Sequence, residues 1–256
     1  MHEIPAITHG GVRALGRRGS LTPLAAAAAP RGAITRSAAF ALAALLVASA
    51  LGYWGVGAYR KAQLQRTIAA LVLDSSERLE TALALEAQAD TASSPQTVGR
   101  LDDQAQEVDK HVIDLHDLND STTRPLAAAA DDYLLTVRQI LRELAASHRY
   151  RVQVSASDER LREHMSKAGR RSAAWMDEAI RAKDRLEKNY FDYRVSAEAL
   201  ERQLASYPET RKKMASQLRV PLLADEPAES ARKRALANSK RIAANVEQTR
   251  QLAAVH

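Results

Sequence analysis

The chain has 256 residues, of which 46% are hydrophobic and 27% are charged, so it is not wholly disordered and has room for one or two packed domains. It contains no cysteine, which excludes disulfides, thiolate metal sites and cysteine nucleophiles but does not identify a redox compartment. The formal net charge is +6.

Residues 1–36 are predicted to form a flexible basic tail, because glycine, proline, alanine and arginine follow one another there without a helical or strand period. Five arginines against Glu3 give this tail most of the chain's net charge. The helices and loops do not cluster basic residues with the aromatic rings that stack on bases. We therefore expect no nucleic-acid partner.

Residues 37–59, SAAFALAALLVASALGYWGVGAY, contain no charged side chain and are long enough to cross a membrane as one helix. Rings that suit the headgroup level gather toward the C-terminal end of this segment: Tyr53, Trp54 and Tyr59. Small residues at four-residue spacing would let a second membrane helix approach closely: Ala44, Ala48 and Gly52. We expect a single transmembrane helix that acts as a signal anchor.

The orientation follows from the short arginine tail, because long domains cross membranes largely regardless of their charge. We expect the N-terminus in the cytoplasm and the C-terminal domain in the periplasm. The membrane would be the inner membrane of a bacterium, because the alanine- and arginine-rich composition resembles that of bacterial proteins. The alternative is secretion to the periplasm after cleavage near Ala50, because Ala48-Ser49-Ala50 satisfies the small-x-small rule. Apolar residues continue past that point, which favours the uncleaved anchor.

Residues 60–220 are predicted to form a helical bundle, because glycine and proline are rare there and apolar residues recur at helical spacing. The first helix should run from about Arg60 to Ala92 and end before TASSPQ. The second and third helices carry apolar seams at steps of three and four, and their connection is short, so we expect antiparallel pairing. The fold class is therefore all-α, a long-helix bundle or antiparallel coiled coil behind the transmembrane helix.

The third helix should begin with a threonine cap before Pro125 and end at a break near 155–157. A fourth helix is expected from about Asp158 to Ser206, followed by a break at SYPET and a short helix to about Arg219. Residues 221–256 are predicted to be a linker and a C-terminal helix that starts near Ala228 and is largely polar.

The fourth helix contains NYFDYR, the densest aromatic cluster of the chain. At about 100° per residue, Tyr190 and Tyr193 fall on its main apolar stripe, which predicts that both are in the core. Phe191 falls on a second, thinner strip with Met176, Ile180 and Val195. Either another helix of the bundle covers this strip, or the strip is an interaction surface.

No catalytic or metal-binding pattern emerges. None of the seven histidines follows a glutamate by three residues, as a di-iron bundle site requires. His111 and His116 lie about 140° apart on a helix and should be solvated, and His148 and His164 flank the predicted break as surface residues. Phosphate-binding loops and nucleophile elbows are also missing from the sequence. We expect no enzyme activity, cofactor or metal.

The remaining functions are binding functions. We expect a membrane-anchored scaffold or interaction protein of the bacterial envelope, with the membrane and a protein partner or a second copy as its partners. The alternative is an extracytoplasmic ligand-sensing bundle with a small molecule between its helices. Because the tail is too short for an output module, such a sensor would act through a partner.

Overall fold

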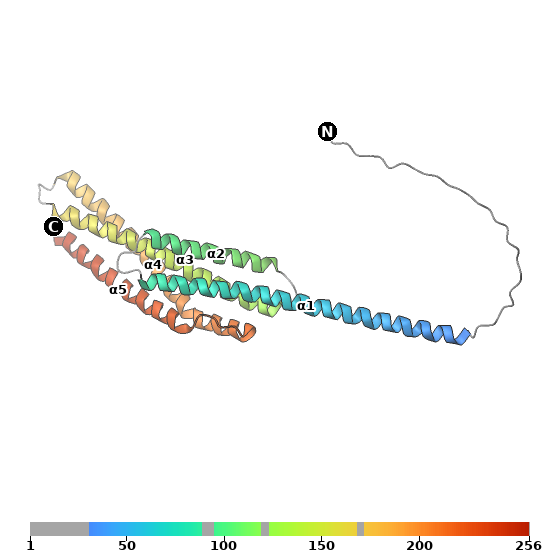
Figure 1. Ribbon diagram of the computed structural model, residues 1–256. Helices are drawn as coiled ribbons and strands as arrows, with labels where there is room; N and C mark the ends of the chain where they lie inside the picture. Colours follow the sequence, from blue (N-terminus) through green and yellow to red (C-terminus); the bar gives the residue numbers. More distant parts are fainter. Residues whose placement is uncertain (1–30, 89–94, 119–122, 168–171, 256) are drawn as a thin grey trace, which may run out of the picture. The chain divides into compact units, whose positions relative to one another are not determined.

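The computed structural model describes residues 31–255 apart from 89–94, 119–122 and 168–171, and within 31–54 it describes only a few side chains. Its α-helices are α1 (Arg31–Gln88), α2 (Pro95–Asp117), α3 (Arg124–Ser166), α4 (Ala173–Leu218) and α5 (Asp225–Val255) (Figure 1). The described residues contain no strand, and the predicted all-α helical bundle is confirmed. The contacts divide the chain into two units, Met1–Trp54 and Gly55–His256, and the packing below lies within the second.

Helix α1 contains the segment predicted to span a membrane and the predicted first helix of the bundle. It begins at Arg31, so the end of the predicted flexible tail is helical, as its alanine-rich continuation favours. It ends at Gln88, before Ala92. Its buried positions recur at steps of three and four and turn one face toward the core: Ile68, Val72, Ser75, Leu79 and Leu83.

The predicted membrane span falls largely outside the side chains that can be described. In the part of the chain that the structure describes, no helix offers a stretch both long and apolar enough to cross a membrane. The side chains of Ala44, Ala48 and Gly52, and the whole of residues 1–30, lie outside the described residues.

Helices α2 and α3 pack antiparallel, as their matching seams predict. Polar pairs between them show the direction, because the residue numbers of the α3 partners increase as those of the α2 partners decrease. They join His116 to Asp131 at 2.9 Å, Asp109 to Arg142 at 2.7 Å and Asp102 to Arg149 at 2.8 Å. Val98 at the start of the predicted α2 seam is half-buried, and the five residues that follow it on the seam are buried: Leu101, Ala105, Val108, Val112 and Leu115. Thr123 is the N-cap of α3, and a proline follows in its first turn.

The break predicted at 155–157 is wrong, because α3 continues to Ser166. The Ser157 hydroxyl donates to the Gln153 carbonyl one turn earlier at 2.8 Å and accepts from Asn189 Nδ2 of α4 at 2.6 Å. These contacts satisfy a polar group that would otherwise weaken a helix interior. The true boundary lies later: Ser172 caps α4 and accepts from the Trp175 backbone N–H at 3.2 Å.

The break predicted at SYPET is also wrong, because α4 continues through Pro208 to Leu218. Proline lacks a backbone N–H and usually interrupts a helix. Here the flanking residues are held by packing, since Leu204, Tyr207 and Met214 are buried. The helix ends with Arg219 in the left-handed conformation, at a φ of 51°, where its N–H donates to the Ala215 carbonyl at 3.0 Å.

Helix α5 begins at Asp225, slightly before the predicted start near Ala228, with acidic residues in its first turn where the helix dipole favours them. The connection before it packs into the core, because Leu222 and Leu223 are buried and the Leu223 N–H donates to Ser76 of α1 at 2.8 Å. Although α5 is largely polar, Ile242 and Val246 are buried against the bundle.

The core has two parts. The larger combines α1, α2, α3, the C-terminal half of α4, the connection after it and the first turns of α5. The smaller lies between the C-terminal half of α3, the N-terminal half of α4 and α5: Val154, Leu161, Ala182, Leu186, Tyr193, Ala197, Ile242 and Val246. The outer side of α4 beside this smaller part contains the predicted interaction residues.

Candidate interaction surface

Helix α4 has an apolar strip on its outer side in addition to its buried face. Met176, Ile180, Phe191 and Val195 are 44%, 54%, 55% and 47% exposed. At about 100° per residue they fall within one sector roughly 100° wide, so they share one side of the helix. We call these four residues the α4 strip. The structure therefore places the predicted interaction residues on one side of α4 and leaves them open to solvent.

The aromatic cluster divides as its helical positions predict. Tyr193 is buried in the smaller core, and burial raises the pKa of its hydroxyl to about 12. Tyr190 packs against the same core. Phe191 is exposed, so the alternative in which another helix of the bundle covers it is wrong. The reason is geometric, because α3 and α5 pack against the side of α4 that carries Leu186 and Tyr193.

One edge of the α4 strip is held by α5. Arg250 Nε donates to Glu187 Oε1 at 2.8 Å, and its guanidinium carbon lies 5.5 Å from the centre of the Tyr190 ring. The hydrogen bond from Arg250 is the largest influence that lowers the pKa of Glu187. Within the strip, the Arg194 guanidinium lies 5.7 Å from the Phe191 ring centre. Charged side chains therefore lie beside and between the apolar residues of the α4 strip.

We expect Phe191→Ser to change the unfolding free energy by less than about 0.5 kcal/mol, as for other surface positions. Leu186→Ala, on the buried face of the same helix, should cost about 2–5 kcal/mol because it leaves a cavity. Urea unfolding at a concentration where the chain is monomeric measures both. A loss near 3 kcal/mol for Phe191→Ser would contradict its placement on the surface.

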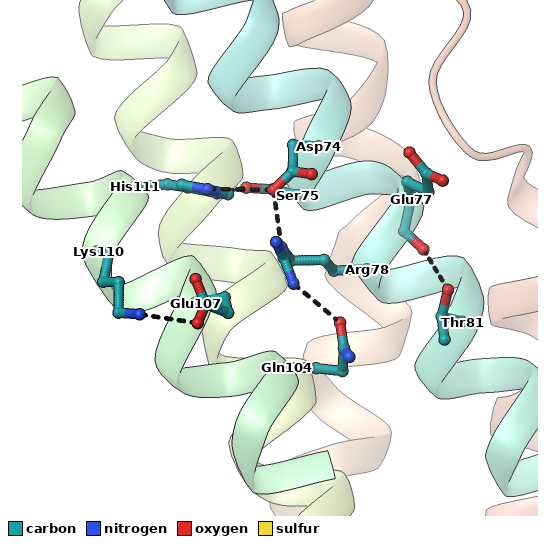
Figure 2. Close-up of polar contacts among 9 residues, drawn as sticks. All are labelled: Asp74, Ser75, Glu77, Arg78, Thr81, Gln104, Glu107, Lys110 and His111. Atoms are coloured by element: carbon teal, nitrogen blue, oxygen red, sulfur yellow. Dashed lines mark hydrogen bonds and ion pairs between the residues drawn. The ribbon is translucent and has the colours of Figure 1, made fainter. Parts of the chain in front are cut away.

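A second candidate is a polar cluster between α1 and α2 (Figure 2). His111 Nε2 lies 3.1 Å from an Asp74 carboxylate oxygen, and its Nδ1 lies 2.8 Å from the Ser75 hydroxyl. A carboxylate only accepts, so Nε2 donates to Asp74 and Nδ1 accepts from Ser75. Arg78 extends the cluster, donating to Asp74 at 2.7 Å and to Gln104 at 3.4 Å.

Serine, histidine and aspartate in contact are the residue types of a nucleophilic triad. Here Ser75 is fully buried, so no substrate reaches its hydroxyl. Burial is the main cause that lowers the pKa of His111, and Asp74 opposes it. The prediction that His111 is solvated is therefore wrong. The cluster fastens α1 to α2 through neutral and charge-assisted hydrogen bonds.

The other histidines also have defined partners. His116 binds Asp131 of α3, so His111 and His116 face different helices, as their angular separation predicts. His164 stacks on Trp175 with ring centres 4.7 Å apart, and its Nε2 lies 3.0 Å from the Trp175 carbonyl. His148 is buried within α3 rather than at a surface break. Among the residues with described positions, no three His, Asp or Glu side chains form a metal site.

Sequence reasoning missed a buried charged cluster between α1, α3 and α5. Glu86 of α1 is 7% exposed and accepts from Arg234 Nε at 2.7 Å, while Arg151 donates to His148 Nδ1 at 3.1 Å. The available signal was the spacing, because His148 and Arg151 continue the apolar seam of α3 beyond Leu144 at steps of four and three. Polar side chains at seam positions predict buried polar contacts.

Comparison with known proteins gives no relative: the chain matches no protein-family profile, no curated protein and no solved structure.

Proposed function

We propose that this chain is a single-pass, membrane-anchored helical scaffold of the bacterial envelope, whose periplasmic bundle binds a protein partner. The α4 strip is the observation that carries this proposal. Its four apolar side chains are between 44% and 55% exposed although a packed core lies on the other side of the same helix. Exposed apolar side chains on a helix whose other side packs in the core are a frequent feature of protein interfaces.

The anchor is proposed from residues 37–59, which contain no charge. Three consecutive described residues there, Leu45, Leu46 and Val47, are 71%, 61% and 59% exposed. Consecutive positions point about 100° apart, so this stretch of α1 presents apolar side chains on several sides. A helix that is apolar all round is favourable in lipid, and the arginines before it favour a cytoplasmic N-terminus.

The hollows support a scaffold over a ligand sensor. The hollow between the helices at Glu86, His148 and Tyr193 has a volume of about 10 Å³, and a water molecule needs at least this much. A hollow of about 360 Å³ lies between α3 and α4 near His164 and is lined mainly by charged side chains, and one of about 400 Å³ lies between α2 and α3 near His116 and is open to solvent. Small-molecule sites are usually enclosed and mostly apolar, so neither hollow has the usual form of a ligand site.

Topology reporters test the anchor. A reporter fused after residue 36 should be active only in the cytoplasm, and one fused after residue 256 only in the periplasm. The product should keep the full-length mass, since cleavage near Ala50 would shorten it. Two cytoplasmic ends would overturn the single-span proposal.

A matched pair of double variants sharpens this test. Leu45→Arg with Leu46→Arg should release the chain from membranes, because each arginine costs about 2.5–3.5 kcal/mol near the middle of a span. Leu236→Arg with Leu252→Arg changes two exposed leucines of α5 and should leave the chain in the membrane fraction. If both double variants were found in the membrane fraction to the same extent, an anchor at this position would be contradicted.

A further inference from the structure

We propose that residues 235–255 of α5 form a pH-sensitive lid, which separates from α3 and α4 when the buried imidazole of His148 binds a proton. The inference goes beyond the proposed function, because it depends neither on the membrane anchor nor on the α4 strip. Its evidence is the contact that His148 makes, the charges beside that contact and the few large apolar side chains that hold this part of α5.

The contact of His148 excludes a proton from one ring nitrogen. His148 lies on the seam of α3 and is 3% exposed. Its Nδ1 lies 3.1 Å from Nη2 of Arg151, which is 6% exposed. A guanidinium only donates, so Nδ1 accepts and the imidazole is neutral. A proton on Nδ1 would remove this hydrogen bond and place two cations in contact.

The charges beside this contact are unfavourable to a further cation. They include side chains of α1 and α5: Glu86, Arg234 and Arg241. Glu86 is the one carboxylate of the three, and it already accepts from Arg234 Nε at 2.7 Å. Tyr193 of α4 faces the same hollow with a neutral hydroxyl, because burial raises its pKa to about 12. A proton on His148 therefore adds to a site that is already positive.

Helix α5 limits the water that reaches the imidazole. Ala235 and Asn238 of α5 line the hollow beside His148, and its volume of about 10 Å³ is the least that one water molecule needs. Burial is the main cause that lowers the pKa of His148 to about 4, and Arg151 adds to the effect. Separation of α5 would admit water and take the charge of Arg241 away. The protonated imidazole is therefore more favourable in the open state.

Residues 235–255 are held to the bundle by few large apolar side chains. Among the described residues of this segment, the large apolar side chains that are buried are Ile242 and Val246. Helices α1, α3 and α4 each bury several such side chains in the core. Local opening favours segments with few buried apolar contacts, so α5 is the helix that should move. Its separation would uncover part of the smaller core.

Hydrogen exchange of the full chain in mild detergent, read by mass spectrometry, tests the lid. Between pH 6.5 and 4.5 the protection factors of residues 235–255 should fall by about 40-fold, the ratio given by a His148 pKa of about 4 in the closed state and 6.5 in the open state. At pH 4.5 they should also be at least about tenfold lower than those of the buried part of α2. The contact of Arg250 with Glu187 does not produce this change, because the hydrogen bond from Arg250 lowers the pKa of Glu187 and keeps it ionised.

Three variants assign the change to His148. His148→Gln keeps a side-chain oxygen that accepts from Arg151 but binds no proton, so its protection factors should fall by less than about threefold. Asn238→Asp keeps the oxygen that accepts from Arg241 at 3.2 Å and adds a carboxylate beside the imidazole, so the fall should be less than about tenfold. His116→Gln removes an exposed histidine of α2 and should leave the fall at about 40-fold.

The other outcomes overturn the inference. Equal protection of α2 and of residues 235–255 at pH 4.5 would show that acid unfolds the bundle as a whole. A fall that persists in His148→Gln, or that is unchanged in Asn238→Asp, would assign the proton to another group. A wild-type chain with no fall would show that α5 does not respond to acid in this range. In each case the topology reporters still test the proposed function separately.

Discussion

Tyr207→Ala should lower the unfolding free energy by about 3–5 kcal/mol, the loss expected when a large buried aromatic side chain leaves a cavity. The Tyr207 ring is fully buried and lies 6.1 Å, centre to centre, from the ring of Tyr133. Its hydroxyl donates to the Leu223 carbonyl at 3.0 Å, which joins α4 to the connection before α5. Removing this side chain therefore disturbs three parts of the larger core together.

The variant Tyr207→Phe separates the hydrogen bond from the packing. It keeps the ring but leaves the buried Leu223 carbonyl without this donor, which should cost about 1–3 kcal/mol. It also removes the contact with the Tyr133 hydroxyl at 3.5 Å. Urea unfolding followed by circular dichroism measures both variants. If Tyr207→Ala cost no more than Tyr207→Phe, the packing of this ring would not hold α4 through Pro208.

His148 should make the bundle less stable as the pH falls from about 6.5 to about 4. Burial is the main cause that lowers its pKa to about 4, and the nearby Arg151 guanidinium adds to the effect. Arg151 donates to His148 Nδ1, so the folded state holds the imidazole neutral. The difference between this pKa and the ordinary histidine pKa of 6.5 corresponds to about 3 kcal/mol of unfolding free energy.

The sign follows from proton uptake on unfolding. Between these two pH values the unfolded chain binds a proton at His148 and the folded chain does not, so acid favours unfolding. This part of the stability is complete above pH 6.5 and is lost as the pH approaches 4. The glutamine of His148→Gln does not titrate. The difference in unfolding free energy between wild type and this variant should therefore shrink steadily as the pH falls from 6.5 to 4. A constant difference would show that His148 titrates normally in the fold.

Much of the architecture follows from local periodicity. The seams of α2 and α3 have matching steps of three and four, and both bury as predicted, because amphipathic spacing alone determines which face of a helix avoids water. The short connection then makes these helices antiparallel. The same angular reasoning separated Phe191 from Tyr190 and Tyr193, and the exposed fractions agree with it.

The helix boundaries depend on contacts with residues that lie far away in the sequence. A serine-rich stretch and a proline normally weaken helices, yet α3 passes through Ser157 and α4 passes through Pro208. Ser157 is satisfied by Asn189 of another helix, and Tyr207 is held by Tyr133 and Leu223. Helix propensity differs by up to about 0.7 kcal/mol per residue for ordinary side chains, and proline costs about 3 kcal/mol, so several buried contacts outweigh it.

The sequence by itself determined the all-α bundle, the helical faces and the apolar strip on α4, since these depend mainly on the spacing of residues within each helix. The tertiary structure decided that Ser75 is buried beside His111 and Asp74, and that Glu86 is buried beside His148. It also left Phe191 uncovered. The physical reason is that burial depends on which helices become neighbours, and that is decided by contacts between residues far apart in the chain.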